Sequence, residues 1–269
     1  MKRLVSLTVL VLATTTMNGF AQNGNSMTVK WSDPSRPGLL SVSVLFGSVS
    51  VKTHSGNDVV ISGSPVARRR PDVTADGLRR IDPGGTDLVV EEANNVITVS
   101  SQSPWNGGNL NIEVPVKTNL KLQTTNGGRI LVEGVEGELE VNSVNGTVRL
   151  DGVSGSVVAN ATNGRLEAVL KQVTPNKPMS FVSMNANVDV TLPPDIRANL
   201  RVRTFNGAAY SDFDIQRSPD AAPVAEDNRN TGGRLRISTD RTINGAINGG
   251  GPDFEFRTLN GNIYIRKAK

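Results

Sequence analysis

The sequence predicts an all-β protein in which short strands stack as the coils of a β-solenoid. Three observations support this fold class. An Asn-Gly pair recurs along the second half of the chain, apolar residues alternate with polar ones on both sides of it, and a Gly-Val pair falls midway between successive copies. We therefore expect coils with two corners each, in which equivalent strands pair between repeats around a narrow apolar interior.

The Asn-Gly pairs that define the repeat begin at residues 126, 145, 163, 206, 244 and 260, and Asn185-Ala186 is a variant. The successive spacings are 19, 18, 22, 21, 38 and 16 residues, so one unit of about 20 residues repeats. We interpret the spacing of 38 as two coils, one of which has lost its Asn-Gly pair. Each pair is expected to form a turn with φ > 0, and the stacked asparagine amides can hydrogen-bond between coils.

Aligning the three clearest copies on Asn-Gly places their apolar residues in register. The aligned sets are Leu120, Leu139 and Val157; Leu122, Val141 and Ala159; Ile130, Val148 and Leu166; and Val132, Leu150 and Ala168. These residues are expected to point inward, whereas Glu140, Arg149 and Glu167 face water. A run of β-hairpins is the alternative, but the midway pairs Gly134-Val135 and Gly152-Val153 favour coils.

The chain begins with features typical of a secretory signal peptide. Lys2 and Arg3 precede an apolar run over residues 4–13, and the small residues Gly19 and Ala21 occupy the third-last and last positions of the segment. We expect cleavage after Ala21, so that a periplasmic or cell-surface protein begins at Gln22. The run is too short to remain as a membrane span, which needs about 20 apolar residues.

Composition narrows the functional classes. The chain has no cysteine and one histidine, so disulfides, thiol chemistry and a Cys/His zinc site are not expected. Its formal charge of +4 falls by two, to +2, once Lys2 and Arg3 are removed, because no acidic residue precedes Asp33. This small excess gives little support to nucleic-acid binding. No cofactor is expected.

The segment LEVNSVNGTVRLDGVSGSVVANATNGRLEAV at residues 139–169 resembles the bacterial DUF4097 family, β-strand repeat proteins whose members are called "putative adhesins". The ending, with GAINGGG at 245–251 and FRTLNGNIYIR at 256–266, looks like that family's closing segment, and NIEVPV at 111–116 resembles the strand ahead of its repeats. The resemblance covers residues 110–266 and, more weakly, 42–63. It implies a right-handed single-stranded β-helix and export to the envelope, and it provides no catalytic residues to carry over.

These features divide the chain into a signal peptide (1–21), an N-terminal β region (22–109) and a repeat domain (110–269). Residues 65–87 and 218–233 lack apolar alternation and are predicted to be polar surface insertions. The first insertion carries the arginines Arg68, Arg69, Arg70, Arg79 and Arg80. These could contact phosphate-bearing envelope polymers, although a solvated loop is the simpler interpretation.

The candidate catalytic groups of this chain are its carboxylates and the single histidine. His54 is predicted to lie where a strand ends in a turn. Paired carboxylates can cleave glycosidic bonds, and arginines such as Arg149 or Arg165 could complete such a site. The carboxylates close in sequence are Glu133, Glu136, Glu138 and Glu140, with a second pair at Asp212 and Asp214. Alternation places most of them on solvated faces.

Residues 249–253, Gly-Gly-Gly-Pro-Asp, lack the repeated pattern of calcium-binding solenoids and are interpreted as a turn between coils. No aromatic residue occurs between Leu120 and Leu170, so a sugar-stacking groove is not expected there. We therefore predict no catalytic, cofactor-binding or metal residues.

The leading hypothesis is an exported, non-enzymatic, adhesin-like envelope protein that contacts an envelope polymer or surface protein. A carbohydrate-active β-helix enzyme is the alternative. A sensory role in the envelope is a third possibility.

Overall fold

The computed structural model describes residues 22–23, 26–65, 88–101, 108–218, 224–227, 235–238 and 242–269. These residues form strands and turns without a helix, so the all-β prediction is confirmed. In this part of the chain, no helix is long and apolar enough to cross a membrane. The predicted signal peptide, residues 66–87 of the first insertion, and residues 219–223 and 228–233 of the second lie outside the described residues.

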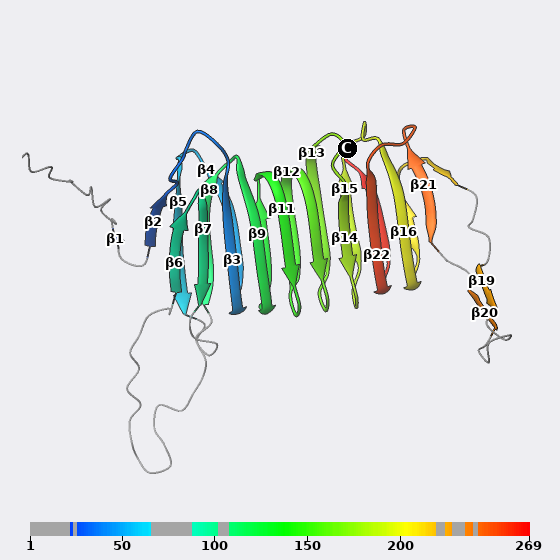
Figure 1. Ribbon diagram of the computed structural model, residues 1–269, viewed down its shortest axis with the longest axis horizontal. Helices are drawn as coiled ribbons and strands as arrows, with labels where there is room; N and C mark the ends of the chain where they lie inside the picture. Colours follow the sequence, from blue (N-terminus) through cyan, green and yellow to red (C-terminus); the bar gives the residue numbers. More distant parts are fainter. Residues whose placement is uncertain are drawn as a thin grey trace, which may run out of the picture.

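The pairings arrange the main 21-stranded sheet as two rows of strands that share β12 (Figure 1). The front row runs in the order β6 (Leu88–Ala93), β7 (Val96–Ser101), β3 (Gly38–Phe46), β9 (Thr118–Asn126), β11 (Glu136–Ser143), β12 (Thr147–Ala161), β14 (Met179–Ser183), β22 (Asp253–Asn260), β16 (Ala198–Asn206), β21 (Ile243–Ile247) and β18 (Ile215–Arg217).

The back row runs in the order β1 (Gln22–Asn23), β2 (Ser26–Lys30), β5 (Asp58–Pro65), β8 (Gly108–Pro115), β4 (Val49–His54), β10 (Arg129–Glu133), β12, β13 (Leu166–Val173), β15 (Val188–Leu192), β23 (Ile263–Lys267) and β17 (Ala209–Ser211). A separate antiparallel pair is formed by β19 (Val224–Asp227) and β20 (Leu235–Ser238), within and just after the second predicted insertion.

Equivalent strands of successive repeats pair in parallel, as the alignment on Asn-Gly predicts. Leu139 lies opposite Leu120 and Val157, and Val148 lies opposite Ile130 and Leu166. Because the strands along residues 118–192 pair in parallel with equivalent strands of neighbouring repeats, the hairpin alternative is wrong for this region. The strands of residues 22–109 continue the same sheet, since β3 pairs with β9 and β4 with β10.

The core lies between the two rows. Val141, Val148 and Leu166 are fully buried, and Leu150 is 1% exposed, as expected from alternation. Burying one such side chain is worth about 1.5–3 kcal/mol, and the aligned positions repeat that contribution in every coil. Toward the end of the stack the filling changes to aromatic rings, since Phe181 and Phe256 stack with centroids 5.4 Å apart.

The asparagines of the Asn-Gly corners form a continuous ladder of side-chain hydrogen bonds, as expected. Each amide nitrogen donates to the amide oxygen of the neighbouring coil over 2.7–2.8 Å. We call this set the asparagine ladder; its members in spatial order are Asn126, Asn145, Asn163, Asn185, Asn260 and Asn206. The ladder ties together six coils along one edge of the stack.

The glycines of these corners do not have positive φ angles, so that part of the prediction is wrong. Their role is to allow close approach of two backbones. A Cβ at Gly164 would lie 2.0 Å from the carbonyl oxygen of Gly146, and one at Gly207 would lie 1.9 Å from that of Gly261. Such contacts are shorter than any Cβ tolerates, which explains why glycine follows asparagine in most copies.

The two Gly-Val corners, in contrast, do require a left-handed backbone. Gly134 has φ of 74° and Gly152 has φ of 62°, and the valines that follow them are fully buried. Side chains other than glycine are disfavoured at such angles because Cβ crowds the backbone. The predicted Gly-Val corners are therefore confirmed.

Spatial order departs from sequence order at both ends of the stack. The coil of β3 and β4 lies between the strands β7 and β8 and the strands β9 and β10. Likewise, the last coil, β22 and β23, is inserted between β14–β15 and β16–β17 (Figure 1).

One predicted corner is not a corner. Asn244-Gly245 lies inside β21, which pairs antiparallel with β16 and β18. The glycine accommodates Ile215, whose Cγ2 would lie 2.5 Å from a Cβ at Gly245. The spacing of 38 residues therefore leads to this antiparallel strand and does not mark a coil that lost its Asn-Gly pair.

Candidate functional site

The predicted carboxylates are divided between the two rows of strands. Glu133 lies on β10 in the back row, whereas Glu136, Glu138 and Glu140 lie on β11 in the front row. Glu140 pairs with Lys121 at 3.0 Å and Glu138 with Lys177 at 2.8 Å. The four glutamates therefore do not come together, because the core separates the two rows.

A second group of charges does come together on the back row. A hollow of about 420 Å³ is lined by outward side chains of β10, β12 and β13, including Glu133, Arg149, Asp151, Arg165 and Glu167. Arg149 contacts Asp151 at 3.1 Å and Glu167 at 3.5 Å. Both predicted arginines thus lie beside carboxylates, and Glu133 is the one member of the predicted glutamate set that joins them.

The charges of this back face are largely balanced by ion pairs within and between coils. The pKa of the Arg149 guanidinium is raised chiefly by its hydrogen bond to Asp151, and that of Arg266 by its hydrogen bonds to Asp189. Glu133 also pairs with Lys52 at 2.9 Å. Exposed pairs of this kind contribute little to stability individually, but they join neighbouring coils.

His54 ends β4 and is followed by a bend, as predicted. Its Nδ1 accepts from the backbone N–H of Gly56 over 3.2 Å, so Nε2 carries the proton and donates to the carbonyl oxygen of Asp58 over 2.8 Å. Both ring nitrogens are therefore used to hold the turn.

The remaining candidate residues lie at exposed positions or in turns. Asp212 and Asp214 are exposed on either side of Phe213, which is 6% exposed. Gly249 and Gly250 have φ of 83° and 84° and form the turn between β21 and β22. Among the described residues, no group of three His, Asp or Glu side chains is placed to hold a metal ion. The arginines of residues 68–70 and 79–80 lie outside the described residues.

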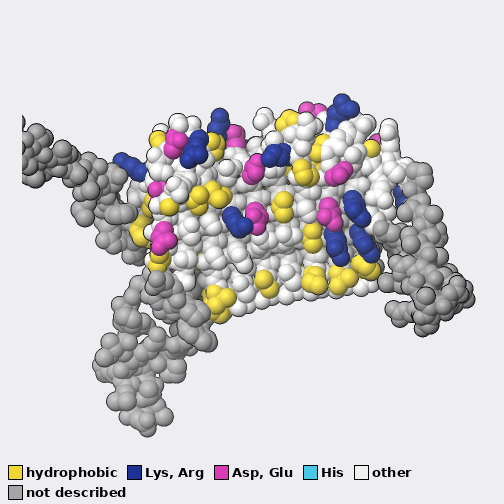
Figure 2. Space-filling view, viewed as in Figure 1, with side chains coloured by type: hydrophobic (Ala, Val, Ile, Leu, Met, Phe, Trp, Pro, Cys, Tyr) yellow, Lys and Arg dark blue, Asp and Glu magenta, His cyan; other side chains and the backbone are white. Residues whose placement is uncertain are grey.

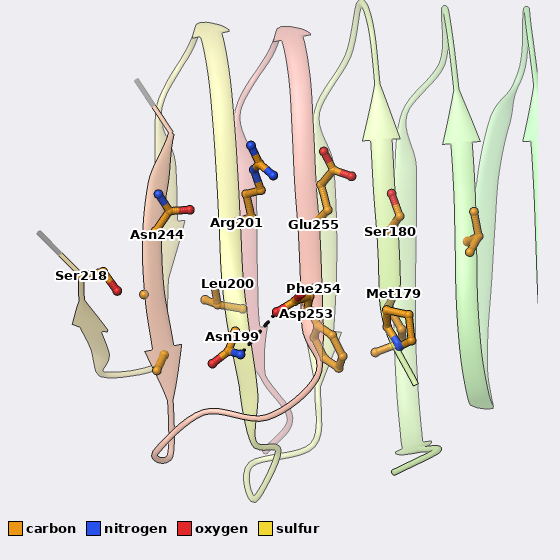
Figure 3. A pocket seen from close by; sticks show the side chains of 14 residues that line it. Met179, Ser180, Asn199, Leu200, Arg201, Ser218, Asn244, Asp253, Phe254 and Glu255 are labelled. Atoms are coloured by element: carbon orange, nitrogen blue, oxygen red, sulfur yellow. Dashed lines mark hydrogen bonds between the residues drawn. The ribbon is translucent and has the colours of Figure 1, made fainter. Parts of the chain in front are cut away.

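A larger hollow, of about 550 Å³, lies on the front row near its end (Figure 3). Its lining includes one cross-strand row of outward side chains, namely Ser180 on β14, Glu255 on β22, Arg201 on β16 and Asn244 on β21. Below that row, Asn199 donates to Asp253 over 3.3 Å. The insertion of β22 beside β16 builds this hollow.

Three arginines lie on β16 and β22 at this end of the front row, and we call Arg201, Arg203 and Arg257 the arginine cluster. Figure 2 shows Lys and Arg side chains gathered there above a line of hydrophobic ones. Arg203 lies directly opposite Arg257. Within the described chain, neither Arg201 nor Arg257 forms an ion pair, in contrast to Arg149 and Arg266.

Exposed apolar side chains border the arginine cluster. Met184 is 49% exposed, Phe205 is 48% exposed and Leu259 is 37% exposed, and each precedes an asparagine of the ladder. We call these three residues the apolar strip. The guanidinium carbon of Arg203 lies 4.8 Å from the centroid of the Phe205 ring. On the back row, Tyr210 stacks on Tyr264 with centroids 5.2 Å apart.

Sequence reasoning missed the arginine cluster although a signal was present. Arg203 and Arg257 both stand three residues before the asparagine of an Asn-Gly pair, so alignment places them at equivalent positions. They become neighbours only because the last coil is inserted beside β16, and sequence spacing gives no indication of that insertion.

Comparison with solved structures gives two chains that are similar at low identity. No family model matches this chain, and no curated protein matches it significantly. A "putative cell adhesion protein" from Clostridium sporogenes is similar at 12% identity with a TM-score of 0.41, over 90% of this chain and 99% of the other. A "putative adhesin" from Bacteroides fragilis is similar at 9% identity with a TM-score of 0.23, over 90% and 96%. Membership of the DUF4097 family stays a prediction.

Proposed function

We propose that this protein is an exported, non-enzymatic component of the cell envelope or cell surface that acts as an adhesin-like interaction module. Its ligand is an envelope polymer or surface protein held on the outer faces of the stack. We also propose that the coils follow a right-handed single-stranded β-helix, as in the DUF4097 family that the repeats resemble.

The observation that carries this proposal is the alignment of outward side chains across coils. In the front row, Ser180, Glu255, Arg201 and Asn244 come from four strands and stand in one line. Neighbouring strands lie about 4.8 Å apart, so such lines present polar groups at a fixed spacing. An extended ligand can contact many coils at once, which suits a polymer better than a small molecule.

The alternative function is a carbohydrate-active enzyme, and one observation favours it. Glu133, Asp151 and Glu167 lie around Arg149 in the back hollow, and clustered carboxylates can supply an acid and a base or nucleophile. Incubating the protein with envelope polysaccharides and measuring new reducing ends tests this. Product formation that Glu167→Gln abolishes would support an enzyme, whereas its absence across neutral and acidic polymers would favour the binding role.

Capture experiments with envelope fractions test the leading proposal. The purified protein should retain glycan or protein from the envelope, identified by composition analysis and mass spectrometry, and cytosolic fractions should retain much less. N-terminal sequencing of the exported form should begin at Gln22. A protein that remains uncleaved in the cytoplasm, or retains nothing from the envelope, would contradict the proposal.

A further inference from the structure

We propose that the arginine cluster and the apolar strip together bind an acidic polysaccharide. The guanidinium groups of Arg201, Arg203 and Arg257 would hold its carboxylate or sulfate groups, and the apolar strip would contact the carbon faces of its sugar rings. This inference rests on the proposed function and names the class of polymer.

The geometry of the cluster suits repeated acidic groups. Arg203 and Arg257 are cross-strand partners on β16 and β22, so their backbones lie about 4.8 Å apart. Arg201 stands two residues before Arg203 on the same face, at about 6.8 Å along the strand. Arginine binds carboxylate and sulfate through two parallel N–H donors. Three guanidinium groups on one face of the sheet could therefore bind the acid groups of successive sugars.

Two of the three arginines, Arg201 and Arg257, form no ion pair within the described residues, whereas Arg149 and Arg266 on the back face do. On β16 and β22, Arg201 lies opposite Glu255, and Arg203 lies opposite Arg257. Glu255 is the one carboxylate among these four residues. Like charges directly opposite each other, such as Arg203 and Arg257, destabilise a sheet. The placement of Arg203 opposite Arg257 therefore does not itself stabilise the sheet, whereas one anionic ligand could contact both guanidinium groups.

The apolar strip supports the same site. Phe205 lies against the guanidinium of Arg203, which restrains that side chain through a cation–π contact. Apolar surface beside the arginines also excludes water, and hydrogen bonds to charged groups are stronger where water is excluded. The ring of an acidic sugar could pack on the exposed Phe205 side chain while its acid group binds the neighbouring guanidinium groups.

The asparagine ladder favours a polysaccharide over a lipid membrane as the occupant. Beyond the apolar strip, the exposed residues Asn185, Asn260 and Asn206 form the outermost edge of these coils. A membrane-inserting edge would place apolar residues outermost. Amide groups at this edge instead match the hydroxyl groups of a sugar chain, which both donate and accept hydrogen bonds.

The experiment measures binding of the purified protein to immobilised alginate, heparin and neutral dextran, and to vesicles rich in phosphatidylglycerol. We expect binding to alginate or heparin that weakens as salt rises, with much weaker binding to dextran and vesicles. Replacing both arginines, Arg203→Ala with Arg257→Ala, should weaken the Kd about tenfold or more, since each charge-assisted contact is substantial.

Matched controls are Lys121→Ala on the front row and Arg165→Ala on the back row, which remove one exposed, ion-paired cation each. Both should bind within about twofold of the unaltered protein. Arg203→Lys with Arg257→Lys keeps the charge and should recover part of the affinity. Thermal unfolding midpoints of all variants should agree, which separates a binding defect from misfolding.

Three results would overturn the inference: equal binding by the double alanine variant, equal loss in the controls, or tighter binding to the vesicles than to either acidic polysaccharide. In each case the proposed envelope role survives if envelope fractions are still retained. Failure of the unaltered protein to retain any polymer or envelope component would instead contradict the proposed function itself.

Discussion

The Gly-Val corners and the Asn-Gly corners use glycine for different physical reasons. At the Gly-Val corner, Gly152 adopts a left-handed conformation, and a Cβ there would meet the flexible side chain of Lys171 at 2.9 Å. At the Asn-Gly corner, Gly164 has no such angle, but a Cβ would lie 2.0 Å from the backbone oxygen of Gly146 in the preceding coil. One corner is limited by its own torsion angles and the other by the distance between coils.

This difference shows that a repeated glycine does not reveal its role by repetition alone. A torsional requirement is local to one coil, whereas a close-approach requirement involves two. Ala186 is consistent with this distinction. It occupies a glycine position where the spacing lengthens to 22 residues, and Met184 shares its N–H between the carbonyl oxygens of Ala161 and Thr162 at 3.3 Å each. The stacking is locally irregular there.

The largest expected loss of stability comes from substitutions in the core between the corners. The effects of substitutions at the two kinds of corner can be compared with it. Leu150→Ala should lower the free energy of unfolding by about 2–5 kcal/mol, through lost burial and a cavity. Arg149→Ala, on the adjacent outward position, should leave the unfolding midpoint nearly unchanged. Chemical denaturation of both variants provides the measurement, and equal shifts would show that the faces are assigned wrongly.

The next effect should arise at the Asn-Gly corner. Gly164→Ala forces two backbones apart and should cost about 1–3 kcal/mol, as overpacking does in other cores. Ala186→Gly is the matched control, because it removes a Cβ at the equivalent position of the next coil. If Gly164→Ala proved as mild as the control, the close-approach explanation would have to be abandoned.

The asparagine ladder should make a smaller contribution. Asn163→Ala removes one bond donated to Asn145 and one accepted from Asn185, and should cost about 1 kcal/mol because these groups are partly solvated. Asn126 takes part in a single ladder bond, so Asn126→Ala should cost about half as much. Equal costs, measured by urea denaturation, would argue against a ladder of independent bonds.

An effect of similar size to that of the asparagine ladder is expected at the Gly-Val corner. Gly152→Ala should cost about 1 kcal/mol from its left-handed backbone, since Lys171 can move aside. Gly152→Asn should cost less, because asparagine tolerates this conformation. Thermal unfolding of the two variants tests the torsional explanation, which predicts that asparagine is the better replacement despite its larger size.

Sequence predicted the local unit of this fold well. Alternation and the Asn-Gly period identified the inward residues, the parallel register and the ladder, because each depends on contacts between adjacent, similar repeats. The left-handed angles predicted for Gly146 and its equivalents were wrong, since glycine satisfies a steric requirement equally well. Asn244-Gly245 was also misassigned, because an Asn-Gly pair inside a strand has the same local sequence as one in a turn.

The candidate site was less accessible to sequence reasoning. The glutamates near residue 138 are close in sequence but divided between two rows, whereas Arg203 and Arg257 are 54 residues apart in the sequence and directly opposite in space. Only the inserted position of the last coil brings those arginines together. The order of the coils in space depends on tertiary packing, and the spacing of repeats along the sequence does not predict it.

The inserted coil also constrains how the chain assembles. Strand β16 reaches the rest of the front row through β22, and β17 reaches the back row through β23. Residues 198–211 are synthesised before residues 253–267, so they must wait for a later segment before they can join the growing stack. Closing this long loop is entropically unfavourable and slows folding. We therefore expect the coil of β22 and β23 to join the stack last. A chain truncated before Asp253 should retain an ordered stack that ends at β14 and β15, and β16 and β17 would then lack the strands that attach them to it.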